Sequence, residues 1–438
     1  MATDPSSIKV GVLSLHESKE SKAILNTLEA LGYEQEWLRQ DSMAFHIDET
    51  GTTIEPSVDV VINRMLLSNT DQPIEGLGLV SIYEDIVPVL NGSGAVLKAM
   101  HKMAAASTLD RFDIPLPETY MGLGYDRLND ARRYFPTKAV YKSAIGTHGG
   151  GTWLIETDKP VEPKVGNRQA LLQEFVSTTG DKHHDYRVYI VGDEILGAMR
   201  RTAKPGEWRT NVAQGGAVKD ATETLPDRVS EIARRSTNAL GLDYAGVDII
   251  EDGSSWYVLE VNPTAGFRGF FRATGRCPAP WIAALAIERA GGTVDYNLVM
   301  DLESTLDDSQ PSCVTNRSVS AFDERPTIGY TEDVVVSGTS GSEHVIALAD
   351  TGASRTSIDL GLAAMIGVGP IKQRTRVKSG LSPQPKPRPV VDLVIGIKGR
   401  WHTVTASIED RSRMDNPVLI GRDILKNYRV GVKRPEEE

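Results

Sequence analysis

The sequence predicts an α/β domain, then a larger α+β region, then a small all-β domain at the end of the 438-residue chain. Between Lys9 and Gly94, short apolar strands alternate with helical patterns, as in small α/β domains. From Ala139 to Asn262, several strand-like runs are separated by Gly-rich turns. After Arg325 the chain consists of short strands with frequent Gly and Pro, which is typical of a compact all-β domain.

Two strands and a helix are predicted in the first domain. Val10–Leu13 and Val58–Ile62 are apolar runs of the kind found in strands that are buried in a parallel sheet. Ser21–Leu31 has helical spacing and is followed by Gly32, a common residue just past the end of a helix. This order of elements indicates a small α/β domain.

Further helices are predicted before the periodic pattern is lost. Helical spacing marks residues 96–112, 227–240 and 279–290. The stretch that follows is rich in Asp, Ser and Asn and has no periodicity, which is typical of a linker. We therefore expect four segments: an N-terminal α/β domain (1–95), a central domain (96–292), a linker (293–324) and an all-β domain (325–438).

Composition restricts the class of protein. A net charge of −11 argues against nucleic-acid binding, which normally requires excess positive charge. The segment from Phe322 onward has 17 Lys and Arg against 15 Asp and Glu, a net charge of +2, which leaves −13 for the rest and favours separate modules. No run approaches the ~18 apolar residues of a membrane span, and Met1–Lys9 lacks the apolar core of a secretory signal. We expect a cytoplasmic protein that binds neither nucleic acid nor membrane.

Oxygen-bearing side chains cluster near residue 250. Asp252-Gly253 has the composition of a turn between two strands. Because side chains alternate along a strand, Glu260 and Asn262 emerge on one face, and an antiparallel return places Asp248 opposite them. Such oxygen ligands suit Mg²⁺, which binds a few carboxylates together with substrate phosphates. A solvated acidic face of a hairpin would give the same pattern. These three residues alone do not distinguish a Mg²⁺ site from such a face.

A second pattern has the composition of a phosphate-binding segment. Lys138–Lys142 is a strand that ends in cations and runs into a glycine-rich loop, Gly146–Gly151. The backbone N–H groups of such a loop can approach phosphate oxygens, and a nearby lysine supplies positive charge. Leu171–Val176 is an apolar strand interrupted by Gln and Glu, whose backbone can pair with an adenine edge. Either segment alone is more often an ordinary turn or strand.

Several short motifs follow one another along the chain: Lys102, Lys142 with its glycine-rich loop, Gln173-Glu174-Phe175-Val176, Asp185-Tyr186-Arg187, Arg209-Thr210-Asn211 with Gly215-Gly216, Gly246-Val247-Asp248 and Glu260-Val261-Asn262. In this order they resemble the ATP-grasp superfamily, and most closely its RimK-like branch of glutamate and amino-acid ligases. The resemblance covers roughly Lys9 to Ala290. It implies three subdomains, with ATP held between two β-rich lobes.

The resemblance implies a role for each position. It assigns two Mg²⁺ ions, with Mn²⁺ as an alternative, to Asp248, Glu260 and Asn262. It assigns ATP to a set of phosphate, adenine and ribose residues: Lys102, Lys142, Gly149, Gly150, Gln173, Glu174, Phe175, Val176 and Asp185. The transferred phosphoryl group and the substrate carboxylate fall to residues whose guanidinium or amide groups bind anions, namely Arg187, Arg201, Arg209 and Asn211. On sequence alone, Arg201 and Arg209 could equally be surface residues.

The implied reaction joins a carboxylate to an amine in two steps. The carboxylate attacks the γ-phosphate of ATP to give an acylphosphate, and the amine then displaces phosphate to form an amide. The protein contributes positioning and charge stabilisation. After Asn262 the chain departs from the family: it reads Pro263–Arg268 where the ligases usually carry small residues and then Pro-Gly, on the side of the substrate.

The C-terminal segment carries two further motifs. An apolar strand ends in Asp350-Thr351-Gly352, and roughly 70 residues later a second apolar run precedes Gly421. Together, in a β-rich segment, they resemble a retropepsin-type aspartic peptidase, closest to the small domains encoded with RimK-like ligases. The resemblance makes Asp350 the catalytic carboxylate, with Thr351 bracing its loop and Gly421 packing closely behind it.

A single Asp-Thr-Gly gives half of a peptidase site. Aspartic peptidases need two carboxylates that share one proton, so a working site requires a second copy in a homodimer. Three hypotheses follow. The first is a ligase that adds glutamate or another amino acid to a peptide or protein, with a peptidase that trims related peptides. The others are a nucleotide-regulated peptidase and a dimeric binding module; the full set of Mg²⁺ ligands and phosphate-side cations favours the first.

Overall fold

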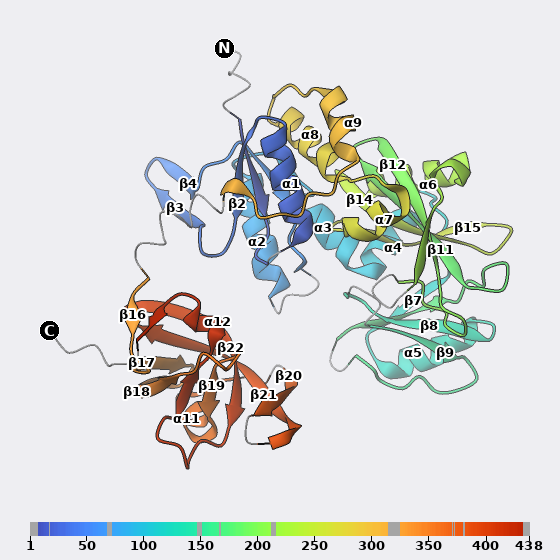
Figure 1. Cartoon of the computed structure of the whole chain (residues 1–438). Coiled ribbons are helices and arrows are strands. Elements are labelled where there is room, and N and C mark those ends of the chain that lie inside the picture. The colour runs from blue at the N-terminus through green and yellow to red at the C-terminus, as the bar shows by residue number, and fades with distance from the viewer. Residues whose placement is uncertain are drawn as a thin grey trace. The chain divides into compact units, whose positions relative to one another are not determined.

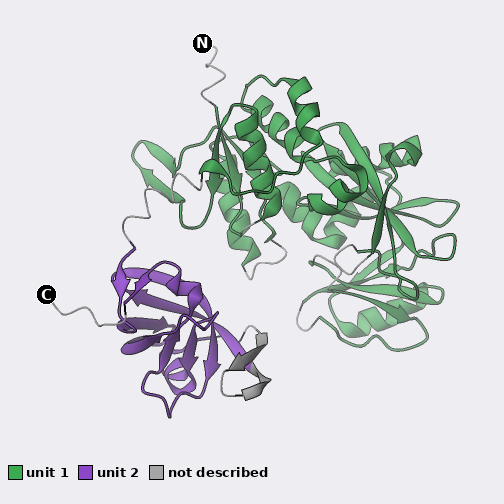
Figure 2. Ribbon diagram, viewed as in Figure 1, with its two compact units in different colours: residues 1–315 green, residues 316–438 purple. Residues whose placement is uncertain are grey.

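The computed structural model describes residues 8–16, 18–67, 72–146, 151–165, 168–211, 216–313, 325–369, 371, 373–379 and 382–431. The elements are labelled in Figure 1. The chain divides into two compact units, Met1–Thr315 and Asn316–Glu438 (Figure 2), and each is considered by itself. Among the helices of the described ranges, none has the length and apolar character that crossing a membrane requires.

The first unit begins with a parallel four-stranded sheet in the order β2-β1-β5-β6. The strand β5 is buried along its whole length and β1 nearly so, which explains their continuous apolar runs. The predicted strands and first helix are confirmed. The elements of this region are β1 (Lys9–Leu13), α1 (Lys19–Ala30), β2 (Glu34–Leu38), the hairpin β3 (Ala44–Asp48) and β4 (Gly51–Glu55), β5 (Val60–Asn63), α2 (Pro73–Glu84) and β6 (Val89–Leu90).

Two helices, α3 (Ser93–Met100) and α4 (Lys102–Asp110), replace the single helix predicted over 96–112. The break is at His101, whose backbone is extended and whose Nδ1 accepts a hydrogen bond from Ala104 N at 3.2 Å. This bond satisfies one of the free N–H groups at the start of α4, so the second helix begins there. Helical periodicity continues through the cap, which is why the sequence pattern indicated one helix. The break makes Lys102 the first residue of α4.

Two antiparallel sheets follow. The first has the order β7-β10-β8-β9 and the second β13-β12-β11-β14-β15. Helix α6 (Asp227–Leu240) packs on the second sheet and has the predicted bounds. The first sheet consists of β7 (Thr119–Gly122), β8 (Lys138–Ser143), β9 (Thr152–Glu156) and β10 (Ala170–Glu174), with α5 (Tyr125–Ala131) against it; the second consists of β11 (His184–Val191), β12 (Glu194–Thr202), β13 (Ala217–Asp220), β14 (Tyr244–Glu251) and β15 (Trp256–Asn262).

The hairpin between β14 and β15 sets the register of the second sheet's last two strands. Gly253 has a left-handed φ of 92°, and Asp252 Oδ1 accepts hydrogen bonds from Ser254 N and Ser255 N. Asp248 and Glu260 are direct cross-strand partners, and Asn262 lies two residues further along β15. The predicted turn and the predicted convergence of these three residues are therefore confirmed.

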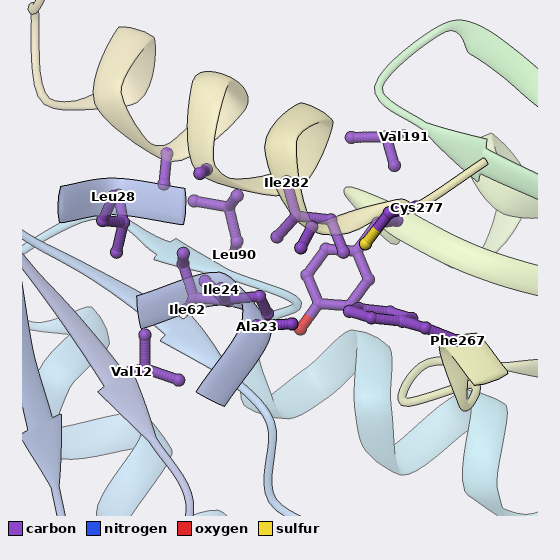
Figure 3. Close-up of a cluster of buried hydrophobic side chains, with 14 of the residues drawn as sticks. Val12, Ala23, Ile24, Leu28, Ile62, Leu90, Val191, Phe267, Cys277 and Ile282 are labelled. Atoms are coloured by element: carbon purple, nitrogen blue, oxygen red, sulfur yellow. The ribbon is translucent and has the colours of Figure 1, made fainter. Parts of the chain in front are cut away.

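A shared core joins the parallel sheet to α7 (Phe267–Thr274) and α8 (Ala279–Arg289), which follow β15, and α9 (Tyr296–Glu303) packs on α8. Figure 3 shows Phe267 beside Ala23 and Ile24 of α1, with Ile282 of α8 in the same cluster. Because this core is continuous, the first turn of α1 is held next to the start of α7.

The range predicted to be a linker, 293–324, contains regular structure in its first part. α9 occupies residues 296–303, starting at Asp295, whose side chain accepts a hydrogen bond from Asn297 N. Beyond α9 the chain packs on α1, because Lys19 Nζ lies 3.0 Å from Asp308 Oδ2 and Asn26 Nδ2 donates to Ser309 O at 3.2 Å. Residues 314–324 lie outside the described ranges.

The second unit is a small β-barrel. Six of its strands close on themselves because β17 pairs with β21 as well as with β18, and β20 extends from β21. The interior contains apolar side chains from nearly all of these elements. The elements are β16 (Thr327–Ile328), β17 (Thr331–Gly338), β18 (Gly341–Ala349), β19 (Ser357–Asp359), α11 (Leu360–Ile366), β20 (Gln373–Ser379), β21 (Ser382–Ile397), β22 (Arg400–Glu409), β23 (Val418–Ile420), α12 (Arg422–Leu425) and β24 (Arg429–Val430).

Candidate active site

A cavity of about 290 Å³ in the first unit is lined by both antiparallel sheets, by the first residue of α4 and by the start of α7. A smaller, mostly apolar cavity beside it shares Lys142 and Leu259 and is also lined by Gln173. The larger cavity brings together most of the predicted site residues, namely Lys102, Lys142, Asp185, Arg187, Arg201, Arg209, Asn211, Asp248, Glu260 and Asn262.

Buried ion pairs connect strands β11, β12 and β14 at this cavity. Arg187 holds Asp248 with two hydrogen bonds, at 2.6 and 2.8 Å. Arg201 holds Asp185 in the same way, both at 2.7 Å, and its Nη2 also lies 2.9 Å from Asp248 Oδ2. Burial raises the pKa of the Asp248 carboxyl, but the two guanidinium groups act against it and hold that pKa below its ordinary value. Asp248 is therefore an anion within a fixed, charge-balanced network.

The network corrects two sequence-based interpretations. Arg201 is 5% exposed and Asp248 is 6% exposed. Arg201 is therefore not a surface residue, and Asp248 does not lie on a solvated acidic face. Asp185 was assigned to the ribose, but both of its oxygens bind Arg201, and Oδ2 also accepts a hydrogen bond from Thr210 Oγ1 at 2.6 Å. Asp185 thus orients Arg201 at the cavity, and its place at the ribose stays a prediction.

Glu260 and Asn262 differ from Asp248 in how the described residues bond to them. Glu260 forms no hydrogen bond or ion pair with any described residue, and Asn262 Nδ2 is buried without a hydrogen-bond partner. A buried polar atom of this kind calls for a partner, and a bound phosphate or metal-ligated water would supply one. No group of three His, Cys, Asp or Glu in the described ranges could hold a metal ion. Two carboxylates and an amide still fit Mg²⁺, which takes several of its ligands from substrate and water.

The two lysines lie on the side of the first sheet. Lys142 is 9% exposed, and its Nζ donates a hydrogen bond to Gln173 Oε1. Burial lowers the pKa of the Lys142 ammonium to about 8, although the Glu260 carboxylate acts in the opposite direction. Lys102 Nζ donates to Gly146 O at 2.9 Å, at the start of the glycine-rich loop. Both lysines face the cavity that the carboxylates line.

The residues expected at the adenine are arranged differently from the prediction. β10 is an inner strand, so the backbone of Gln173 and Glu174 pairs with neighbours on both sides and is not free for a base. Phe175 and Val176 follow the strand and do not line the cavity; the Phe175 ring instead stacks on His183 at 5.2 Å, and His183 Nε2 bonds Val176 O. The predicted Gly149 and Gly150 lie outside the described residues.

Other cavity residues were not predicted. His183 and Trp208 form an aromatic wall with Phe175, and Arg209 lies over the Trp208 ring while its Nη2 donates to Thr152 O at 2.6 Å. Glu20 of α1 and Arg268 of α7 also line the cavity. Trp208 and Arg268 adjoin motifs that the sequence analysis named, whereas nothing in the sequence around Glu20 indicates its place.

The second unit holds the predicted Asp350 where β18 ends beside β23. Asp350 N donates to Ile420 O at 3.0 Å, and Asp350 Oδ1 accepts a hydrogen bond from Gly352 N at 2.8 Å. A Cβ on Gly421 would lie 2.4 Å from the carbonyl carbon of Arg355, so glycine is needed for the close packing that was predicted there.

Within the described chain a threonine other than Thr351 bonds to this loop. Thr351 is exposed and forms no hydrogen bond with a described residue. The buried Thr356 bridges the two motifs instead: its Oγ1 accepts a hydrogen bond from Gly421 N at 3.1 Å and donates to Asp423 Oδ1 at 2.8 Å.

Known proteins are similar to the first unit. "Probable alpha-L-glutamate ligase 2" of Hahella chejuensis is 31% identical over 259 residues, covering 56% of this chain and 78% of the relative. "Probable alpha-L-glutamate ligase" of Stutzerimonas stutzeri is 34% identical over 209 residues, covering 46% and 68%. Residues 99–282 match the family described as RimK-like ATP-grasp domain.

Solved structures share the fold at low identity. The ATP-grasp ligase PsnB, complexed with a phosphomimetic variant of its minimal precursor, Mg and ADP, gives a TM-score of 0.52 at 17% identity, over 64% of this chain and 98% of PsnB. The D-cycloserine synthetase DcsG gives a TM-score of 0.50 at 15% identity, over 64% and 99%. The first unit therefore has the ATP-grasp fold, and the chain belongs to the RimK-like ATP-grasp ligase family.

Proposed function

We propose that the first unit uses ATP to join an amino acid, with glutamate the leading candidate, to a carboxylate of a peptide or protein. One observation carries the proposal: a single cavity is lined by two lysines, by Asp248 and Glu260, and by Asn262, whose Nδ2 is buried without a partner among the described residues. This arrangement suits a triphosphate held between cations and a divalent metal. The names of the relatives in Hahella and Stutzerimonas support glutamate as the amino acid.

The residues would divide the work as follows. Lys102 and Lys142 bind phosphate oxygens, and Asp248, Glu260 and Asn262 would hold Mg²⁺, which neutralises charge on the polyphosphate when bound. The substrate carboxylate takes the γ-phosphoryl group, and ADP leaves. The amine then attacks the acyl carbon; a C–N bond forms, the C–O bond to phosphate breaks, and phosphate carries away the electron pair. The proton that the amine loses passes to phosphate or solvent.

The carboxylate Glu260 gives the sharpest test of this proposal. In Glu260→Gln the metal would lose a charged ligand, so we expect amino-acid-dependent phosphate release to fall roughly 100-fold or more, a loss of several kcal/mol of transition-state stabilisation. The control is Glu194→Gln, an exposed carboxylate on the same sheet, which should keep wild-type rates and the same melting temperature. Unchanged turnover in Glu260→Gln would refute the metal assignment.

A second function, peptide hydrolysis by the barrel unit, is favoured by Asp350. This carboxylate sits at the end of β18 in a loop that the close approach of Gly421 and Arg355 holds. With one such carboxylate per chain, we propose that two copies pair to complete the site, one carboxylate acting as acid and the other as base. Cleavage of oligoglutamate peptides should be lost in Asp350→Asn and blocked by a pepstatin-like inhibitor. Cleavage that persists in Asp350→Asn would exclude this function.

The barrel also admits a role without catalysis. In that case the second unit would be a dimerising binding module, and the first unit a ligase or a nucleotide sensor. Phosphate release that responds to an added amino acid distinguishes a ligase from a sensor. Peptide cleavage distinguishes a peptidase from a binding module.

A further inference from the structure

The end of the large cavity that α1 and α7 form is chemically unlike the rest. The lysines and metal ligands come from α4 and the two antiparallel sheets, whereas this end is lined by Glu20 of α1 and by Gly266 and Arg268 at the start of α7. Gly266 and Arg268 belong to the segment Pro263–Arg268, where the sequence departs from the ATP-grasp ligases it otherwise resembles. A site that reads the substrate is expected where relatives differ.

Glu20 is fixed in position by both of its oxygens. Oε1 accepts a hydrogen bond from Phe267 N at 3.3 Å, and Oε2 accepts one from Ser18 Oγ at 3.2 Å. Phe267 is fully buried against Ala23 and Ile24 of α1 (Figure 3), so the core holds α1 and α7 together at this point. The carboxylate is only partly buried and therefore keeps lone pairs that can face a ligand.

Arg268 stands out among the arginines of the cavity. Arg187 and Arg201 are bound to carboxylates, and Arg209 is bound to Thr152 O. Arg268 is exposed and has no hydrogen bond or ion pair with any residue in the described ranges, Glu20 included. It follows directly on Phe267, whose backbone N–H holds Glu20. The Glu20 carboxylate and the Arg268 side chain thus line one cavity, and no ion pair joins them in the described structure.

We propose that Glu20 and Arg268 recognise the incoming substrate as a free amino acid, Glu20 binding its ammonium group and Arg268 its α-carboxylate. The inference rests on the proposed ligase function and names the substrate class at the same site. An ammonium and a carboxylate on one carbon match a carboxylate and a guanidinium that line the same cavity, the carboxylate being bonded to the residue before the arginine. A peptide amino terminus or a simple amine carries no α-carboxylate and would leave Arg268 unpaired, so these are the competing occupants.

The test uses the full chain and begins with wild-type protein, ATP, Mg²⁺, a glutamate-ended acceptor peptide and each proteinogenic amino acid in turn. The amino acid that gives the most phosphate release is then compared with its α-amide, which keeps the amine and loses the α-carboxylate. We expect Arg268→Met to raise KM for the amino acid about 10- to 100-fold, the size of a charge-assisted contact, with kcat and the KM for ATP little changed. The KM for the α-amide should be equal in Arg268→Met and wild type.

Matched controls keep the result specific. Arg272→Met removes an exposed arginine one turn further along α7 that does not line the cavity. Glu29→Gln removes the charge of an exposed carboxylate on α1 that does not line the cavity either. Both variants should behave as wild type. Glu20→Gln keeps an acceptor for Phe267 N and should raise KM for the amino acid and its α-amide alike. If Arg268→Met raises KM equally for both, or for neither, the recognition pair is wrong while the ligase stands.

Failure of the ligase proposal itself would look different. In that case the wild-type chain releases no phosphate with any amino acid. Equilibrium dialysis with radiolabelled L-glutamate then tests the Glu20–Arg268 pair directly. Weaker binding to Arg268→Met than to wild type and Arg272→Met supports the pair. Equal binding to all three proteins, or no binding to any of them, overturns it.

Discussion

Asp248 and Asp350 are the two acidic residues on which the proposed activities depend, and their surroundings are opposite. Asp248 is 6% exposed, and two arginines of the same chain bind its oxygens. Asp350 is half-buried, and within the described part of the chain its carboxylate accepts one hydrogen bond, from Gly352 N, and forms no ion pair. In the complete site, the charge of Asp248 is balanced by arginines of the same chain. In the incomplete site, no described residue balances the charge of Asp350, so a partner for its carboxylate would have to come from a second molecule.

The largest expected effect comes from removing a counter-charge in the complete site. Arg201→Met leaves Asp185 and Asp248 buried beside one arginine, so we expect the first unit to lose about 3–5 kcal/mol of stability. Urea unfolding of the full chain, monitored by tryptophan fluorescence, measures this loss. Five of the six tryptophans lie in the first unit, and only Trp401 lies in the second. Asp350→Asn should change stability by less than ~0.5 kcal/mol. Equal urea midpoints for Arg201→Met and Asp350→Asn would contradict the proposed difference between the two sites.

The incomplete site depends on backbone packing instead of charge. In Gly421→Ala the new methyl group would meet the Arg355 carbonyl carbon at 2.4 Å, which should destabilise the barrel by about 1–3 kcal/mol and abolish peptide cleavage. Gly369→Ala is the control, because nothing lies within 4 Å of its Cβ position. Ligase rates should stay at the wild-type level in both variants. A Gly421→Ala protein that still cleaves peptides would show that the loop does not need this contact.

Dilution sharpens the same contrast. If the peptidase needs two copies, its activity per chain should fall up to about tenfold for each tenfold dilution below the dimer dissociation constant, while ligase activity per chain stays constant. Both rates can be read from one dilution series, with sedimentation velocity reporting the oligomeric state. A peptidase rate that stays proportional to protein concentration in a monomeric sample would contradict the two-copy site.

The smallest effect concerns Lys142. Burial lowers its pKa to about 8, so the side chain is charged below that pH and neutral above it. Binding of Mg·ADP should therefore weaken as pH rises, about fivefold between pH 8 and pH 9, because less of the protein carries the cation. Calorimetric titrations at each pH measure this. In Lys142→Arg the dependence should disappear, since arginine stays charged; a slope that persists would come from another group.

Local rules predicted the parts of the site that lie close together in the sequence. The turn at Gly253 and the alternation of side chains along a strand bring Asp248, Glu260 and Asn262 together, and the register in the structure agrees. Helix α6 was predicted with its bounds because its spacing ends at Gly241, which adopts the left-handed conformation. The C-terminal unit was predicted to be a small all-β domain that resembles retropepsins, and the structure shows it to be a small β-barrel.

Contacts between distant segments could not be predicted in the same way. The pairing of Arg187 with Asp248 joins residues 61 positions apart, and Glu20 meets Phe267 across 247 positions. The position of an inner strand also needs the whole sheet, which is why the backbone of Gln173 was thought to be free. The helix break at His101 was missed because a side-chain cap leaves the apolar spacing of the sequence unchanged.

That break at His101 makes Lys102 a link between the two antiparallel sheets. Lys102 N is bonded to Ala144 O just past β8, and its Nζ is bonded to Gly146 O, while Lys142 is part of β8 itself. The rest of α4 packs into the core of the second sheet through Ala105 and Leu109. A polyphosphate bound by both lysines would therefore be held by the first sheet and by a helix that is anchored in the core of the second.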